Sequence, residues 1–84
     1  MSLLNEILEA FPGEEILIVD GFDNAIIGID EQSMRLIYSV RKCIDILTEE
    51  MCEEDALEHF HYNVSGAYVG PNTPIWSRDD FELL

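Results

Sequence analysis

Positive charge is scarce in this 84-residue chain, which has 4 Lys or Arg residues against 18 Asp or Glu residues. Binding to the phosphates of a nucleic acid depends on Lys and Arg side chains, and the formal net charge of −14 opposes it. We therefore expect no direct nucleic-acid partner.

Long apolar runs are also absent. The longest covers residues 16–19, whereas a membrane-spanning helix needs about 20 apolar residues. The chain does not open with the basic and apolar regions of a secretion signal. The sequence therefore predicts a cytoplasmic protein without a membrane partner. Its two cysteines, Cys43 and Cys52, are then expected to be reduced thiols and not a disulfide.

The chain nevertheless has enough apolar residues for a hydrophobic core. They make up 48% of the sequence, which argues against disorder, and 84 residues suffice for a single domain over residues 1–84. Ser2 and Pro12-Gly13 delimit an N-terminal helix within residues 1–13 whose apolar residues recur at helical spacing.

Three strands are expected next. Glu15 to Val19 is rich in β-branched and aliphatic residues without polar alternation, which predicts an interior strand buried on both faces. Ala25 to Ile29 and Met34 to Ser39 follow after short polar turns. Because short connections join antiparallel neighbours, these three strands are expected to form a meander.

The second half of the chain is expected to be mainly helical. One helix runs from Val40 to Met51, and another begins at Glu53 and ends either at Gly66, as a left-handed cap, or at Gly70. Ile75-Trp76 then forms a short edge strand, and residues 77–84 form a loose tail. The expected fold class is α+β, in the order α-β-β-β-α-α-β, with a small antiparallel sheet covered by helices.

The motif FxxNVxGAYVGxxTPIW over residues 60–76 carries a family resemblance. With the preceding patterns at residues 23–28, 38–47 and 51–56, it resembles a widespread group of small, uncharacterised proteins of tailed bacteriophages. The resemblance implies a phage or prophage origin and a bacterial cytoplasm, and it implies no activity.

Residues with catalytic or metal-binding chemistry are poorly placed for it. His59 and His61 are two apart on the predicted helix and point to opposite sides, so they do not share a metal ion. Cys52 and His59 are about two helical turns, or about 10 Å, apart, which is too far for proton transfer. We therefore expect no catalytic residue, no metal, no cofactor and no enzyme activity.

Aromatic residues gather around the motif and leave two interpretations open. They can form part of the core, or they can line a ligand pocket together with nearby polar side chains. The pocket residues would be Asn63, Tyr68, Thr73 and Trp76.

Acidic residues are concentrated between Lys42 and Arg78, where no other Lys or Arg occurs. They form either a solvated face or a surface that docks on a basic groove of a host protein, as an inhibitor or nucleic-acid mimic would. The candidate partner-binding residues are Asp45, Glu49, Glu50, Glu53, Glu54 and Glu58.

The leading hypothesis is accordingly a non-enzymatic phage interaction protein that modulates a host protein through these acids. One alternative is a small-ligand or nucleotide-binding module built on the aromatic pocket. Another is a structural phage accessory protein that forms a homo-oligomer through the strand Ala25 to Ile29 or through the N-terminal helix.

Overall fold

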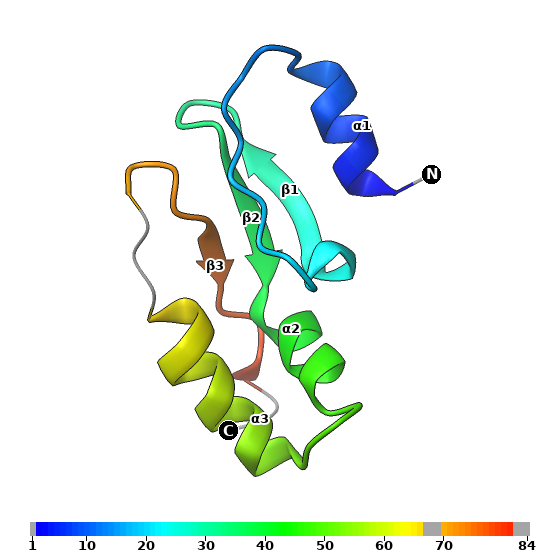
Figure 1. The fold of residues 1–84 in the computed structure, drawn as a ribbon, viewed down its shortest axis with the longest axis vertical. Helices are drawn as coiled ribbons and strands as arrows, with labels where there is room; N and C mark the ends of the chain where they lie inside the picture. Colours follow the sequence, from blue (N-terminus) through cyan, green and yellow to red (C-terminus); the bar gives the residue numbers. More distant parts are fainter. Residues whose placement is uncertain (1, 67–69, 82–84) are drawn as a thin grey trace.

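Helices lie at both ends of the molecule and a small sheet lies between them, as the computed structural model in Figure 1 shows for residues 2–66 and 70–81. The predicted α+β class is confirmed. The elements are α1 (Leu3–Ala10), the 3-10 helix η1 (Asp23–Ala25), β1 (Ile26–Asp30), β2 (Arg35–Ser39), α2 (Val40–Leu47), α3 (Glu53–Phe60), the π-helix η2 (His61–Ser65) and β3 (Ile75–Ser77).

The hairpin of β1 and β2 forms where the sequence predicts it, with Asp30 opposite Arg35 at its closed end. The Asp30 carboxylate closes the turn, because it accepts hydrogen bonds from the Gln32 N–H (3.3 Å) and the Ser33 hydroxyl (2.7 Å). The Ser33 hydrogen bond is the main cause of a lowered pKa of Asp30. Polar side chains in the turn thus fix the register of the hairpin.

The predicted interior strand Glu15 to Val19 is wrong, because in the structure this segment belongs to no sheet. The segment does not pair with the outer edge of β1, where the predicted meander would place it, and its Val19 N–H instead donates to the side-chain hydroxyl of Tyr38 (2.9 Å). Residues 14–22 instead run as an irregular trace between α1 and η1 (Figure 1). Ile16 and Val19 pack against the core, but Ile18 is 41% exposed, so the segment is not buried on both faces. The meander is therefore reduced to a two-stranded hairpin.

The C-terminal edge strand forms as predicted, but the sheet is mixed and not antiparallel. β3 pairs in parallel with β2, with Ile37 opposite Ile75 and Ser39 opposite Ser77. The long connection through α2 and α3 brings the chain back to run in the same direction, which no short turn allows.

The core joins the sheet to the helices through aromatic contacts. The Trp76 ring lies 5.2 Å from the Tyr38 ring and 5.3 Å, edge to face, from the Phe60 ring. Tyr38 and Leu36 of β2 are completely buried, as are Cys43 of α2 and Ala56 of α3. β2 is therefore the central element of the core.

The N-terminus of α2 begins at the predicted cap, Ser39, whose hydroxyl oxygen accepts a hydrogen bond from the Lys42 N–H (3.1 Å). This first turn contains no acidic residue, although negative charge is favourable there. Asp79 supplies the charge from the C-terminal segment, accepting hydrogen bonds from the Ser39 hydroxyl and the Arg41 N–H (2.8 Å). Burial raises the pKa of Asp79, but these hydrogen bonds outweigh it and leave the pKa lowered.

The predicted loose tail covers residues 77–84, and the structure gives residues 77–80 of it fixed contacts, whereas residues 82–84 lie outside the described residues. Asp80 is buried and forms a two-point ion pair with Arg78, whose Nε and Nη2 donate to the carboxylate oxygens at 2.9 and 3.1 Å. No local pattern indicates these contacts, because the partners of Asp79 lie about 40 residues away along the chain.

The helices end differently from the prediction. α2 stops at Leu47, and the helix from Glu53 changes to π-helix at His61. Gly66 has φ −78°, so the predicted left-handed cap at this residue is wrong. The alternative continuation to Gly70 passes through residues 67–69, which lie outside the described residues. Within residues 2–66 and 70–81, no helix has the length and apolar character needed to cross a membrane.

Candidate functional site

The six candidate acids are all exposed, one on α2, two in the turn that follows and three on α3. α3 buries Ala56 and Phe60 against the core, which leaves its acids facing solvent. Glu53 and Glu54 lie in the first turn of α3, where carboxylates complement free backbone amides. Their charge stabilises the N-terminus of α3, where the N-cap residue, Cys52, makes no capping hydrogen bond through its side chain. We call the six residues the acidic helical surface.

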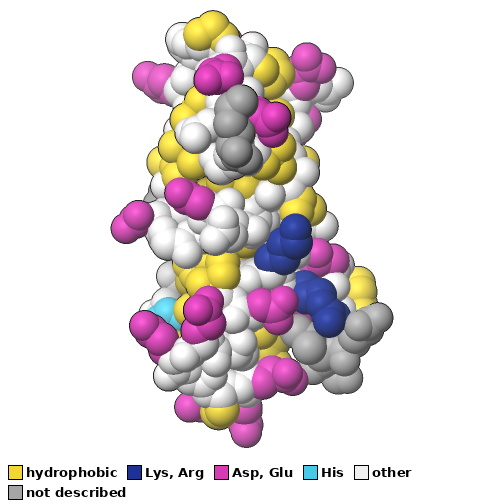
Figure 2. All heavy atoms as spheres, turned by 90° about the vertical axis from the view of Figure 1, so that its right-hand side faces the viewer, with side chains coloured by type: hydrophobic (Ala, Val, Ile, Leu, Met, Phe, Trp, Pro, Cys, Tyr) yellow, Lys and Arg dark blue, Asp and Glu magenta, His cyan; other side chains and the backbone are white. Residues whose placement is uncertain are grey.

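Positive charge does not neutralise this surface. Among the described residues, no ion pair joins any of the six acids to Lys or Arg, and Arg78 is paired with Asp80. Figure 2 shows Asp and Glu side chains scattered over one whole face of the molecule, with few Lys or Arg side chains between them. Acidic side chains are therefore not confined to the acidic helical surface.

One hollow joins the acidic helical surface to acids that the sequence analysis did not include. Glu49 lines a hollow of about 390 Å³ together with Asp20, in the loop before η1, and Asp23, the first residue of η1. Glu49 follows α2 and is more than 20 residues from Asp23 in sequence, so only the tertiary structure brings these carboxylates to one hollow.

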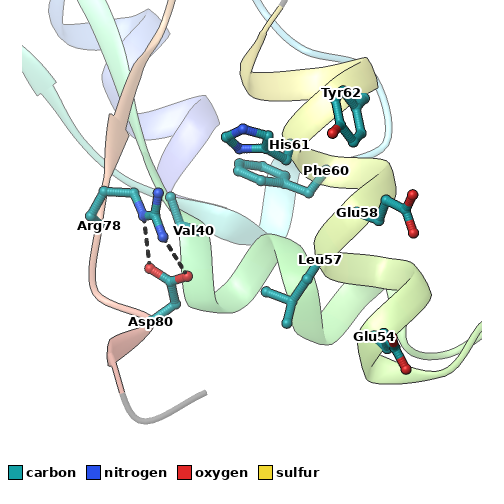
Figure 3. Close-up of a pocket in the computed structure, with 9 residues that line it drawn as sticks. All are labelled: Val40, Glu54, Leu57, Glu58, Phe60, His61, Tyr62, Arg78 and Asp80. Carbon is teal, nitrogen blue, oxygen red and sulfur yellow. Dashed lines mark hydrogen bonds and ion pairs between the residues drawn. The ribbon is translucent and has the colours of Figure 1, made fainter. Parts of the chain in front are cut away.

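A second hollow, of about 370 Å³, lies between α3 and the C-terminal segment. Figure 3 shows Leu57, Phe60 and His61 projecting toward the Arg78–Asp80 pair, whereas the carboxylates of Glu54 and Glu58 point away from the hollow. Its floor is therefore largely apolar, and its one ion pair is satisfied internally. The two glutamates face solvent and belong to the acidic helical surface.

A groove of about 420 Å³ lies on the sheet side of the molecule, and two of the four predicted pocket residues line it. Asn63 and Trp76 form part of one wall, and residues 17–20 form the other. Thr73 is not among the lining residues; its hydroxyl donates to the Gly70 carbonyl at 2.6 Å and so stabilises the turn before β3. Tyr68 lies outside the described residues. The predicted pocket is thus only partly assembled as expected.

The groove wall contains an unsatisfied polar atom. Trp76 Nε1 is buried and donates to no acceptor. Most buried donors in proteins have a partner, so an orphan at the edge of a cavity marks a place where an acceptor would be favourable. Sequence analysis singled out Trp76 by its aromatic ring, but it had no means of finding the unpaired N–H.

Comparisons with family models, with curated proteins and with solved structures give no match to this chain. Function is therefore inferred from the geometry of the chain itself.

The thiols and imidazoles do not form a catalytic arrangement in the described residues. Cys43 is completely buried, and burial, with a smaller contribution from the Asp79 charge, raises its pKa to about 12, so it is a poor nucleophile. Cys52 is exposed, and His59 lies near the amide of Asn63 (Nδ1 to Nδ2, 3.4 Å) and not near a thiol. Residues 2–66 and 70–81 contain no group of three or more His, Cys, Asp or Glu residues placed to hold a metal ion.

The two surfaces predicted for self-association, on β1 and α1, expose only a few large apolar side chains among the described residues. β1 is an outer strand of the sheet, and Ile27, at the irregularity in its register, is 42% exposed. On α1, Leu3 and Leu8 are 39% and 38% exposed. Isolated exposed apolar side chains of this kind are normal on soluble proteins.

Proposed function

We propose that this chain is a non-enzymatic interaction protein of bacteriophage type, which binds and modulates a basic surface of a host protein. The observation that carries the proposal is that all six carboxylates of the acidic helical surface are exposed and unpaired among the described residues. A partner with Lys and Arg side chains would supply the missing counter-charges.

Electrostatics favour this function in two ways. An acidic protein with net charge −14 attracts a basic partner over a distance of about 10 Å at 0.1 M salt, which speeds association. Carboxylates on two successive helical segments also imitate the repeated charges of a phosphate backbone, so a nucleic-acid-binding groove is a suitable target. Such binding weakens steeply as salt concentration rises.

The experiment is a pull-down from bacterial lysate with two variants of equal charge. One replaces three glutamates of the acidic helical surface by glutamine, at positions 50, 54 and 58. The other replaces Glu6, Glu9 and Glu31, which are also exposed but lie on α1 and in the hairpin turn. Each variant loses one carboxylate from the first turn of a helix, so the two are matched in helix capping as well as in charge.

We expect the wild type and the α1 and hairpin-turn variant to retain the same basic protein at low salt. The acidic-surface variant should lose it, and so should the wild type at high salt. Equal retention by both variants would mean that net charge alone matters, and the proposed surface would then be wrong.

A further inference from the structure

The segment before η1 has the composition of a strand but lacks a strand's partners. Val19 uses both of its backbone groups: its N–H donates to the Tyr38 hydroxyl oxygen (2.9 Å), and its carbonyl accepts from the Phe22 N–H (3.4 Å). The backbone N–H and C=O groups of residues 15–18 make no hydrogen bond to the described part of the chain. A run of free backbone groups on an apolar segment is a template for pairing with another strand.

This free backbone lies beside the groove of about 420 Å³ described above. Leu17, Ile18 and Val19 line one wall, and Val64, Pro74 and Trp76 line the other. The volume falls within the range of about 300–1,000 Å³ that is usual for binding pockets. In an extended chain every second side chain points to the same face. An extended chain could therefore place these side chains between the two apolar walls.

Two further observations indicate what would fill the groove. The Trp76 N–H is buried without an acceptor, and a shift of the indole on binding would bring it to a peptide carbonyl, an acceptor that an extended chain presents at every residue. Acids also flank the apolar run, with Glu14 and Glu15 before it and Asp20 after it. A second copy of this chain would bring a further charge of −14 to the same place, whereas a basic segment would be attracted.

We propose that this groove binds an extended segment of a partner protein, with alternating apolar and basic residues, by strand addition along residues 15–18. The segment pairs with the free backbone of these residues, places its apolar side chains between Leu17 and Trp76, and offers a carbonyl to Trp76 Nε1 once the indole shifts toward the groove. Its basic residues face the flanking acids. This site is separate from the acidic helical surface, and either can exist without the other.

The probe is an end-capped peptide that alternates valine with lysine, and its control is the same peptide with N-methyl groups on every internal residue. Methylation keeps the side chains and the charge but removes the N–H groups of both edges, so it prevents strand pairing. Trp76 is the only tryptophan of the chain, and its fluorescence therefore reports on the groove directly. Hydrogen exchange of the amides of residues 15–18 reports on pairing.

We expect the unmethylated peptide to change Trp76 fluorescence and to slow exchange by about tenfold or more at every second amide of residues 15–18, those on the paired edge. The methylated peptide should do neither. The proposal would be overturned if both peptides bind equally, if binding leaves these amides unprotected, or if no binding occurs up to about 1 mM peptide.

Variants at Ile18 separate strand pairing from simple charge attraction. Ile18 is exposed and its N–H is unused in the described structure, so Ile18→Pro removes a pairing donor without removing a native hydrogen bond. Ile18→Thr keeps the N–H and serves as the matched control. We expect the proline variant alone to lose binding of a fluorescent form of the peptide, with unchanged circular dichroism. The variant with glutamine at 50, 54 and 58 should still bind the peptide. If this variant does not bind, the peptide binds to the acidic helical surface and not to the groove.

Discussion

The acidic helical surface and the Trp76 groove are opposite kinds of candidate site. The first has many charges, all of them solvated, and no unsatisfied buried atom is found among its described residues. The second has a single carboxylate, Asp20, on its wall, but it combines apolar side chains with free backbone groups and an orphan indole N–H. A charged surface favours fast, salt-sensitive association, whereas a groove with unpaired donors favours a specific geometry.

The comparison teaches that charge and unmet hydrogen bonding are separate signals of binding. Exposed acids cost little when no partner is present, because water solvates them. Buried donors without acceptors cost free energy in the folded chain, so their presence calls for a reason. The two regions should therefore respond differently to substitution, and the following measurements test that difference in order of expected size.

The largest effect is expected in the sheet that carries the groove. Leu36→Ala should lower the free energy of unfolding by about 3 kcal/mol, because Leu36 is completely buried and its truncation leaves a cavity. Urea unfolding measures this change. Ile27→Ala on the neighbouring strand is the control, and a clearly smaller loss is expected because Ile27 is 42% exposed. Equal losses would contradict the position assigned to β2 in the core.

A smaller effect is expected where the groove segment is fastened to the sheet. Tyr38→Phe should cost about 1–2 kcal/mol, because it leaves the part-buried Val19 N–H without its acceptor. Hydrogen exchange at the Val19 amide should accelerate in parallel. Tyr62→Phe, at a side chain that is 73% exposed, should change stability by less than about 0.5 kcal/mol. Unchanged exchange at Val19 would mean that the Tyr38 hydroxyl does not hold the segment.

The cap that Asp79 provides for α2 should appear as a pH dependence. Because the folded-state pKa of Asp79 is lowered, its stabilising contribution is present above the unfolded value of about 3.9 and is lost as pH falls through the folded value. Asp79→Asn should therefore be less stable than the wild type by about 0.5–1 kcal/mol near neutral pH, and this difference should shrink below about pH 4. Urea unfolding across this range provides the measurement.

Asp45→Asn is the matched control for that experiment. Its carboxylate lies on the exposed side of α2 and makes no hydrogen bond to a described residue. The variant controls for the loss of one carboxylate from α2 without the loss of a capping hydrogen bond. A constant difference for Asp79→Asn would contradict the capping role.

The smallest effect is expected on the acidic helical surface. Replacing Glu50, Glu54 and Glu58 by glutamine should change stability by only a few tenths of a kcal/mol, since exposed carboxylates without ion pairs contribute little. Added salt should raise the melting temperature of the wild type more than that of the variant, because the wild type has more self-repulsion to screen. A decrease in the free energy of unfolding as large as that expected for Leu36→Ala would show that these acids stabilise the fold.

Local sequence signals determined much of this protein. The caps Ser2 and Ser39, the hairpin from residue 26 to residue 39 and the amphipathic helices follow from spacing and turn chemistry within a few residues. The exposure of the six acids also followed, because charged side chains in turns and on the polar face of amphipathic helices face water.

Only the tertiary structure decided which segments pair. Glu15 to Val19 and Ile75 to Ser77 both have the composition of strands, but only the second joins the sheet, in parallel with β2. The earlier segment does not pair with the outer edge of β1 and is held instead by the hydrogen bond from the Val19 N–H to the Tyr38 hydroxyl, which leaves free backbone groups beside Trp76. This choice depends on contacts between residues far apart in the chain, so no local pattern in the sequence records it.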